Sequence, residues 1–247
     1  MQRNVLITGA SRGIGKAIAI HLAKDNWTPL IHYRVQETDA KEVARQTNGI
    51  CAPFGTDLSN AGDCEKLWEW AESIGTLHAL VNNAGIYHPV SFDCDSDEDF
   101  EENWESTFET NFFSVVRLTR FFVTHVKNNS VEMPKILNIC SRVGFRGEPG
   151  ASAYAASKSA QINLTRSLAV ELAPLGIRVF GMAPGWVETA MTRHGMETRR
   201  KAIEASIPLG RVATVDDIGA VARFLMNDES EYLSGVVIDV NGASYFH

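Results

Sequence analysis

Tyr154 and Lys158 are the two residues whose types and spacing most clearly suggest chemistry. They lie four residues apart in a segment of strong helix formers, and on a helix this spacing places both side chains on one face. A phenol has a pKa of about 10 when unperturbed, and a neighbouring ammonium lowers that pKa by stabilising the phenolate. The pair predicts a tyrosine that exchanges a proton with a substrate oxygen. An amphipathic helix with an exposed Tyr and Lys is the alternative for this motif alone.

A glycine-rich turn near the amino end is the second chemical motif. An apolar run that begins at Asn4 ends at Thr8, glycines follow at positions 9, 13 and 15, and a helical pattern comes next. The run is typical of a buried parallel strand. A turn of this kind lets backbone N–H groups approach a pyrophosphate at a helix N-terminus. Taken alone, it is equally a plain glycine-rich turn.

Four motifs in order resemble those of the short-chain dehydrogenase/reductase family. They are T-G-A-S-R-G-I-G from Thr8, N-N-A-G from Asn82, S-x12-Y-x3-K from Ser141, and P-G at Pro184. Asn111 falls between the second and the third motif, and the resemblance covers nearly the whole chain. The match is closest to the β-ketoacyl-acyl-carrier-protein reductases. It includes the segment Glu188-Thr189-Ala190-Met191-Thr192 and the chain ending Val240-Asn241-Gly242-Ala243-Ser244-Tyr245.

The resemblance implies roles for four catalytic residues. Tyr154 would be the acid/base, Lys158 would lower its pKa and hold the nicotinamide ribose, and Ser141 would hydrogen-bond the substrate oxygen. Asn111 would hold a water molecule that links Lys158 to solvent, and a satisfied core amide is the alternative for this residue. The hydride would come from the cofactor.

The resemblance also implies a dinucleotide site, and we expect no metal site. The expected cofactor-binding residues are Gly9, Ser11, Arg12, Gly13, Ile14 and Gly15 in the phosphate turn, Arg34, Asp57 and Leu58 near the adenosine, Asn83, Ala84 and Gly85 beside its ribose, Tyr154 and Lys158, and Pro184, Gly185, Val187 and Thr189 around the nicotinamide.

The second strand indicates which dinucleotide is preferred. Folds of this type that bind NAD place an acid at the end of this strand to hold the ribose 2′-hydroxyl, whereas here no acid occurs before Glu37. Arg34 begins the following loop and Arg12 lies in the glycine turn. Because a guanidinium binds a phosphate through two parallel hydrogen bonds, we expect both arginines to meet the 2′-phosphate of NADP(H). Two solvated surface arginines are the alternative.

Alternating strand and helix patterns predict the fold class. We expect strands near 4–8, 28–33, 50–54, 77–82, 135–140, 177–182 and 236–240, and helices near 14–25, 38–47, 61–74, 100–127, 152–173, 190–205 and 214–227. This alternation is typical of an α/β, Rossmann-like, doubly wound parallel sheet of about seven strands with helices on both faces. No linker or repeat divides the chain, so we expect a single domain over residues 1–247. Ligands of such sheets bind beyond the carboxyl ends of the strands, where the motifs fall.

Composition narrows the classes of partner and location. The chain has 247 residues, 45% hydrophobic and 21% charged, with a net charge of -7, so neither a nucleic acid nor an anionic membrane is an expected partner. No apolar run is long enough to span a membrane, and the first strand leaves no room for a signal peptide. The four cysteines form no C-x-x-C pair, which favours reduced thiols in a cytoplasmic protein.

The expected helix 100–127 is apolar on two sides. One broad stripe contains Phe108, Phe112, Val115, Val116, Phe122, Val123 and Val126, while Phe113 and Phe121 fall on the other side with Arg117 between them. A helix that is apolar on two sides is buried on two sides. The resemblance implies pairing of this helix and the 152–173 helix in a homodimer or homotetramer. Two singly exposed aromatic residues are the alternative.

Two further segments have no motif. Residues 92–103 contain seven acids, namely Asp93, Asp95, Asp97, Glu98, Asp99, Glu101 and Glu102. They lack the ligand spacing and central glycine of an EF-hand, so we expect a solvated loop and an acidic first helical turn. Residues 190–207 are expected to form a mobile lid, lined by Met191, Met196 and Trp186 unless these side chains simply pack within the helix.

The sequence therefore predicts an NADPH-dependent ketoreductase, with a β-ketoacyl thioester as the expected substrate and acyl carrier protein as a possible carrier. Basic residues around the mouth of the active site would suit that acidic carrier. In the resembling reductases such arginines lie at the ends of the 100–127 and 152–173 helices, where this chain has Asn128-Asn129-Ser130 and Val170. The arginines that could take their place are Arg142, Arg146, Arg193, Arg199 and Arg200. The alternatives are a reductase for other ketones, sugars or steroids, and a dinucleotide-sensing regulator without turnover.

Overall fold

The strands are short apolar runs that end where the polar motifs begin. The computed structural model describes residues 2–247. Its seven parallel strands are β1 (Arg3–Ile7), β2 (Trp27–Ile31), β3 (Ile50–Cys51), β4 (Leu77–Asn82), β5 (Lys135–Ile139), β6 (Arg178–Pro184) and β7 (Val237–Val240), and they form one sheet in the order β3-β2-β1-β4-β5-β6-β7. The expected Rossmann-like sheet is confirmed.

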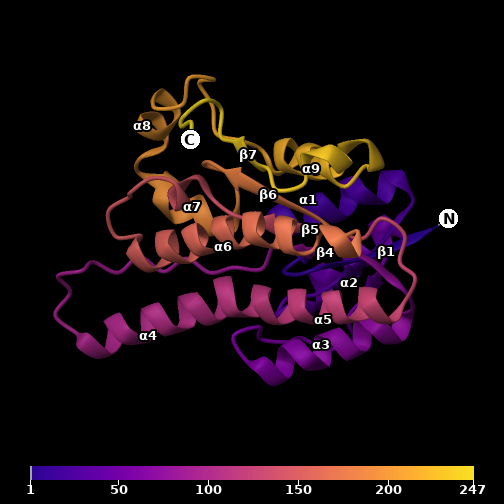
Figure 1. Ribbon diagram of the computed structural model, residues 1–247. Helices are drawn as coiled ribbons and strands as arrows, with labels where there is room; N and C mark the ends of the chain where they lie inside the picture. Colours follow the sequence, from indigo (N-terminus) through magenta and orange to yellow (C-terminus); the bar gives the residue numbers. More distant parts are fainter. Residues whose placement is uncertain (1) are drawn as a thin grey trace.

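The helices cover both faces of this sheet. They are α1 (Gly13–Leu22), α2 (Glu37–Thr47), α3 (Ala61–Ile74), α4 (Asp97–Phe108), α5 (Ser114–Asn128), α6 (Ser152–Glu171), α7 (Ala190–Glu197), α8 (Arg200–Ala205) and α9 (Val215–Leu225). Helices α1, α2 and α9 pack together on one face, and α3, α5 and α6 lie on the other (Figure 1). The chain reverses its direction of travel across the sheet between β1 and β4, which opens a crevice at the carboxyl ends of these strands.

The long helix expected at 100–127 is two helices with a wider turn between them. It begins at Asp97, and a π-helical turn from Glu109 to Phe113 separates α4 from α5. Such a turn inserts one residue into the helix and so rotates the two halves relative to each other. Val115, Phe122 and Val126 are buried as expected, whereas Val116, assigned to the same stripe, is exposed beside Phe113.

Two other boundaries differ from the sequence-based expectation. The third strand is only two residues long and lies at the edge of the sheet, where a proline such as Pro53 is tolerated directly after it. The helix expected over 190–205 is divided into α7 and α8 around Thr198 and Arg199. The acidic first turn of α4 is confirmed, and Ser96 caps it by accepting a hydrogen bond from the Asp99 N–H.

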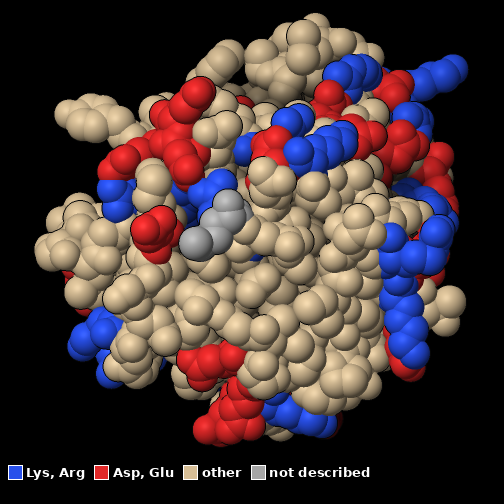
Figure 2. Space-filling view, turned by 90° about the vertical axis from the view of Figure 1, so that its right-hand side faces the viewer, with Lys and Arg blue, Asp and Glu red and all other residues tan. Residues whose placement is uncertain are grey.

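The surface shown in Figure 2 carries charges of both signs, and the cysteines form no disulfide in the described residues. On the side shown in Figure 2, Lys and Arg are interspersed with Asp and Glu around a broad uncharged area. All four cysteines are free, and Cys64 and Cys140 are buried. Among residues 2–247, no helix combines the length and the apolar character that crossing a membrane requires.

Candidate active site

One cavity gathers the motifs. It has a volume of about 570 Å³ and lies at the carboxyl ends of the strands. Of the expected site residues, it is lined by Gly9, Ser11, Arg12, Gly13, Ile14, Arg34, Asp57, Leu58, Asn83, Ala84, Gly85, Ser141, Tyr154, Lys158, Pro184, Gly185, Val187 and Thr189. Gly15 and Asn111 lie behind the cavity wall rather than on it.

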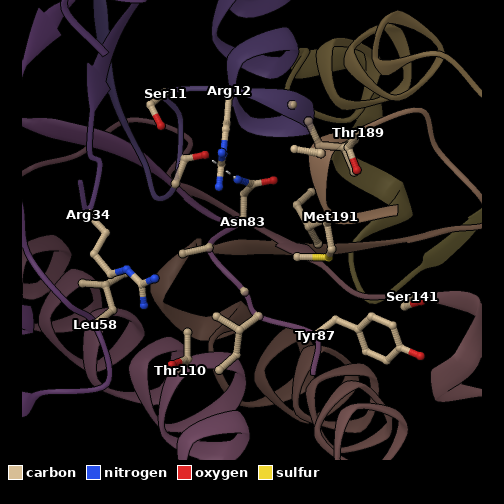
Figure 3. A pocket seen from close by; sticks show the side chains of 18 of the residues that line it. Ser11, Arg12, Arg34, Leu58, Asn83, Tyr87, Thr110, Ser141, Thr189 and Met191 are labelled. Atoms are coloured by element: carbon tan, nitrogen blue, oxygen red, sulfur yellow. Dashed lines mark hydrogen bonds between the residues drawn. The ribbon is translucent and has the colours of Figure 1, made fainter. Parts of the chain in front are cut away.

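A cluster of hydrogen bonds joins the loops that follow β1 and β4. Thr8 Oγ1 accepts hydrogen bonds from the N–H groups of Asn83 and Ala84, each at 2.9 Å. In return, the Asn83 amide donates to the carbonyl oxygens of Thr8 at 2.8 Å and Gly9 at 3.1 Å. This Thr8–Asn83 junction fixes the glycine turn against N-N-A-G, and Figure 3 shows the Asn83 side chain beside that of Arg12.

The glycine turn has the shape that a phosphate group needs. Gly9 and Gly13 have φ values of 62° and 56°, a left-handed conformation that glycine adopts without steric cost. In the described chain, no side chain caps the N-terminus of α1 and no acid lies in its first turn. The N–H groups and positive dipole end of this helix are therefore available to an anion at the cavity wall. These features fit the pyrophosphate of a dinucleotide.

His32 supports the glycine turn through a hydrogen bond with Gly9. Sequence reasoning did not identify this residue. Its Nδ1 accepts a hydrogen bond from the Gly9 N–H at 2.9 Å, and its Nε2 lies 3.1 Å from the Thr56 carbonyl oxygen. The first contact requires an unprotonated Nδ1, so Nε2 carries the proton and donates to Thr56. Burial lowers the pKa of His32 to about 4, and the ring is therefore neutral at physiological pH. A histidine at the end of the second strand was the available signal.

Two arginines reach into one end of the cavity. Arg12 comes from the glycine turn and Arg34 from the loop after β2 (Figure 3). Arg34 forms a long ion pair with Asp57, 3.4 Å between Nη1 and Oδ2, in which both side chains are about half exposed. No acid occupies the end of β2. The two guanidinium groups at this end are thus accessible to a phosphate.

Tyr154 lies at the other end of the cavity with Ser141 and Tyr87. Burial raises the pKa of Tyr154 to about 12, and the hydrogen bond with Ser141 only partly offsets this effect. The ring of Tyr87 meets that of Tyr154 edge to face, with 5.1 Å between ring centroids. Tyr154 is therefore a neutral phenol at neutral pH, able to donate a proton. Tyr87 was missed by sequence reasoning, although its place just after N-N-A-G was a signal.

Desolvation is the largest influence on the pKa of Tyr154 and raises it, so the expected lowering of that pKa by Lys158 stays a prediction. Lys158 Nζ donates to the Ile139 carbonyl at 2.7 Å and to Gln161 Oε1 at 2.9 Å, and it lies 5.8 Å from the Tyr154 ring centroid. Burial lowers the pKa of Lys158 itself to about 8. Desolvation thus shifts both groups toward their neutral forms.

Asn111 is fully buried in the π-helical turn, where its amide is used by protein groups. Its Oδ1 accepts from the Ile86 N–H at 2.8 Å, and its Nδ2 donates to the Ile86 carbonyl at 3.0 Å and to Ser157 Oγ at 3.3 Å. The side chain therefore ties the loop after β4 to α6, as the alternative of a satisfied core amide stated. Its expected role in holding a water molecule stays a prediction.

Only one of the three apolar side chains expected to line the lid reaches the cavity. Met191 lines it and is 47% exposed. Met196 is buried instead in a separate cluster with Ile203 and Ile207, against which Trp186 packs. The correction follows from the break between α7 and α8, because the second helix folds back onto the first and buries these side chains.

Comparisons with known proteins agree with this geometry. The family model for short chain dehydrogenase matches residues 3–200. An acetoacetyl-CoA reductase of Allochromatium vinosum is 36% identical over 255 aligned positions, covering 100% of both chains. A 3-oxoacyl-acyl-carrier-protein reductase of Thermotoga maritima is 34% identical, covering 96% of this chain and 95% of the relative.

A solved structure shares the fold over almost the whole length. A Sinorhizobium meliloti protein, described as a candidate short-chain alcohol dehydrogenase, superposes with a TM-score of 0.89 and is 32% identical. The match covers 99% of this chain and 97% of that protein.

The close packing behind the glycine turn generates a prediction. A Cβ at position 15 would lie 2.4 Å from the Gly9 carbonyl oxygen and 2.5 Å from Asn83 Nδ2. We expect Gly15→Ala to force these backbones apart and to lower the free energy of unfolding in urea by about 1–3 kcal/mol. Gly147→Ala is the matched control, because nothing lies within 4 Å of its added Cβ. Equal stability of the two variants would contradict the packing described.

Proposed function

The chain belongs to the short-chain dehydrogenase family, and we propose that it is an NADPH-dependent ketoreductase that reduces a 3-oxoacyl thioester to the 3-hydroxyacyl thioester. The observation that carries the proposal is the position of a half-buried, neutral Tyr154 beside Ser141 at one end of a cavity, with two arginines at the other end. A proton donor and a binding site for a phosphorylated dinucleotide are the two parts that carbonyl reduction requires.

The residues of this chain would act as follows. Ser141 donates a hydrogen bond to the substrate carbonyl oxygen and holds it near Tyr154. The dinucleotide, when bound, supplies the hydride. Tyr154 then gives its phenolic proton to the oxygen on which negative charge develops. The Lys158 ammonium stabilises the tyrosinate that remains, and solvent returns the proton.

The substrate class is supported by similarity and by the lining of the cavity. Both curated relatives described above bear names of 3-oxoacyl thioester reductases, with coenzyme A in one case and acyl carrier protein in the other. Tyr87 and Met191 give the catalytic end an apolar wall, which suits a short acyl chain. The chain retains Tyr154 and Lys158, which favours turnover over a dinucleotide-sensing role.

Two of the arginines expected to form a basic rim for an acyl carrier protein are buried or paired with acids. Of the arginines considered as substitutes for a basic rim, Arg142 is only 5% exposed and donates to Ser244 Oγ at 2.6 Å. Arg200 is engaged by Glu188 and Glu204, and Val170 is 80% exposed. Arg142 and Arg200 are thus not available to an acidic carrier protein, which leaves Arg146, Arg193 and Arg199 of these positions, so we favour the coenzyme A thioester as the first substrate to assay.

We also propose that two copies pair through α4, the π-helical turn and α5. Residues 97–113 hold seven acids and no base, whereas residues 114–128 hold Arg117, Arg120 and Lys127 and no acid. Antiparallel pairing of two such helices would place each acidic half beside a basic half. Phe113 and Val116, 42% and 38% exposed, lie between the halves, where a two-fold axis would bury them.

The first prediction of the proposal concerns catalysis. Wild-type protein should oxidise NADPH when acetoacetyl-CoA is added, and Tyr154→Phe should lower kcat by about 10²–10⁴-fold, because the variant lacks only the donated proton. Absorbance of the reduced nicotinamide gives both rates. Parallel assays should include the same acyl group on acyl carrier protein and a panel of simple ketones. Turnover of those ketones with no thioester turnover would refute the substrate class.

The second prediction concerns the choice of dinucleotide. The double change Arg12→Ala and Arg34→Ala should raise KM for NADPH about tenfold or more, since each guanidinium can make charge-assisted hydrogen bonds to the 2′-phosphate. KM for NADH should change little. Arg45→Ala is the matched control, because Arg45 is exposed on α2 and paired with Glu42. A wild-type kcat/KM that is as high for NADH as for NADPH contradicts this assignment.

The third prediction concerns assembly. Phe113→Glu and Val116→Glu should each shift the protein toward monomer in sedimentation velocity, because each change places a charge in the centre of the proposed contact. Raising the salt concentration should weaken the wild-type assembly. Leu209→Glu, at a residue 69% exposed elsewhere on the surface, should leave the sedimentation coefficient unchanged. A wild-type monomer at micromolar concentration would exclude this interface.

A further inference from the structure

Gln161 is a buried polar residue whose side chain contacts Lys158. It lies three residues after Lys158 on α6 and is only 1% exposed. Its Oε1 accepts a hydrogen bond from Lys158 Nζ at 2.9 Å, and the Ile139 carbonyl oxygen accepts another at 2.7 Å. Burying a polar amide costs free energy unless it is paired, and a leucine would fill a similar volume without that cost. The pairing with Lys158 is therefore the contact that accounts for a glutamine here.

The groups that stabilise the ammonium of Lys158 are uncharged hydrogen-bond acceptors. In the described part of the chain, no carboxylate pairs with Lys158, which is 4% exposed. The titratable groups that face it are Tyr154 on α6 and Cys140 after β5. Burial raises the pKa of Tyr154 to about 12 and that of Cys140 to about 11, so neither offers a negative charge at neutral pH. Asn111 and Ser157, which lie close by, are bonded to each other.

We propose that Gln161 is a positioning residue for Lys158, whose amide oxygen keeps the buried ammonium charged and fixed beside the Ile139 carbonyl. An ammonium has three N–H donors, and the two acceptors use two of them. The third stays available for a ligand in the cavity. The importance of this for turnover rests on the proposed function, in which that ligand is the dinucleotide ribose.

The protonation of Lys158 can be measured directly in the cofactor-free protein. Lysine labelled with ¹³C at Cε reports the charge of each Nζ through its chemical shift, and Lys158→Met identifies the resonance of Lys158 by its absence. Gln161→Leu removes an acceptor that favours the charged form, so the pKa of Lys158 should fall by about one to two units. Gln161→Glu adds a negative charge at the same place, and the pKa should rise above the wild-type value.

Two controls separate this role from a general effect on folding. Thr165→Val breaks the hydrogen bonds of Thr165 Oγ1 with the Asn138 amide, 2.9 Å, and with the Gln161 carbonyl oxygen, 2.8 Å. It leaves the Gln161 side chain and its contact with Lys158 in place, and should leave the pKa of Lys158 unchanged. Gln161→Leu should also reduce NADPH affinity above pH 7, measured by nicotinamide fluorescence, but should have no such effect in a Lys158→Met background.

The outcomes distinguish this inference from the proposed function. An unchanged pKa of Lys158 in a folded Gln161→Leu variant would falsify the inference even if the enzyme reduces thioesters. An equal shift in Thr165→Val would also overturn it, because the effect would then be general. A shifted pKa with no thioester or NADPH activity in the wild type would support the inference and refute the proposed function.

Discussion

The Thr8–Asn83 junction is the constraint on which the rest of the site depends. A parallel sheet ends every strand at the same edge, but it leaves the loops that follow free to diverge. Here one hydroxyl and one amide tie the loops after β1 and β4 together through four hydrogen bonds. The glycine turn, and with it the N-terminus of α1, is thereby held at a fixed distance from Gly85 and the catalytic end. His32 and Gly15 support the same turn from behind.

Burial, more than charge pairing, sets the protonation states in the cavity. It moves the pKa of His32 to about 4, that of Lys158 to about 8 and that of Tyr154 to about 12. Each shift favours the neutral form of its group. The cavity thus has a catalytic end in which Tyr154 is neutral and Lys158 is still mostly protonated at neutral pH, and a second end made cationic by two arginines. A dinucleotide that carries its negative charge on phosphates matches this division.

The sequence alone was sufficient for the architecture and for most of the cavity wall, because glycine turns and strand ends are local patterns whose meeting place is dictated by parallel topology. It was insufficient where a tertiary contact decides the outcome. The direction of the Tyr154 pKa depends on burial and on where Lys158 points, and neither can be read from a four-residue spacing. Tyr87 and Gln161 belong to no motif, so only the packing around Tyr154 and Lys158 reveals them. The exposure of Val116 depends on one inserted helical residue.

That inserted residue restricts how the length of this chain can vary. In an α-helix each residue turns the chain by about 100° and advances it by about 1.5 Å. Deleting one residue from Glu109–Phe113 would let α4 and α5 run as one regular helix, but would rotate one half against the other by about that angle. Asn111 would leave the Ile86 loop, and the stacked rings of Trp104 and Phe108 would turn away from Phe112. Among related chains, insertions and deletions should therefore occur in the loop before α4, because a change in the length of that loop does not rotate α4 relative to α5.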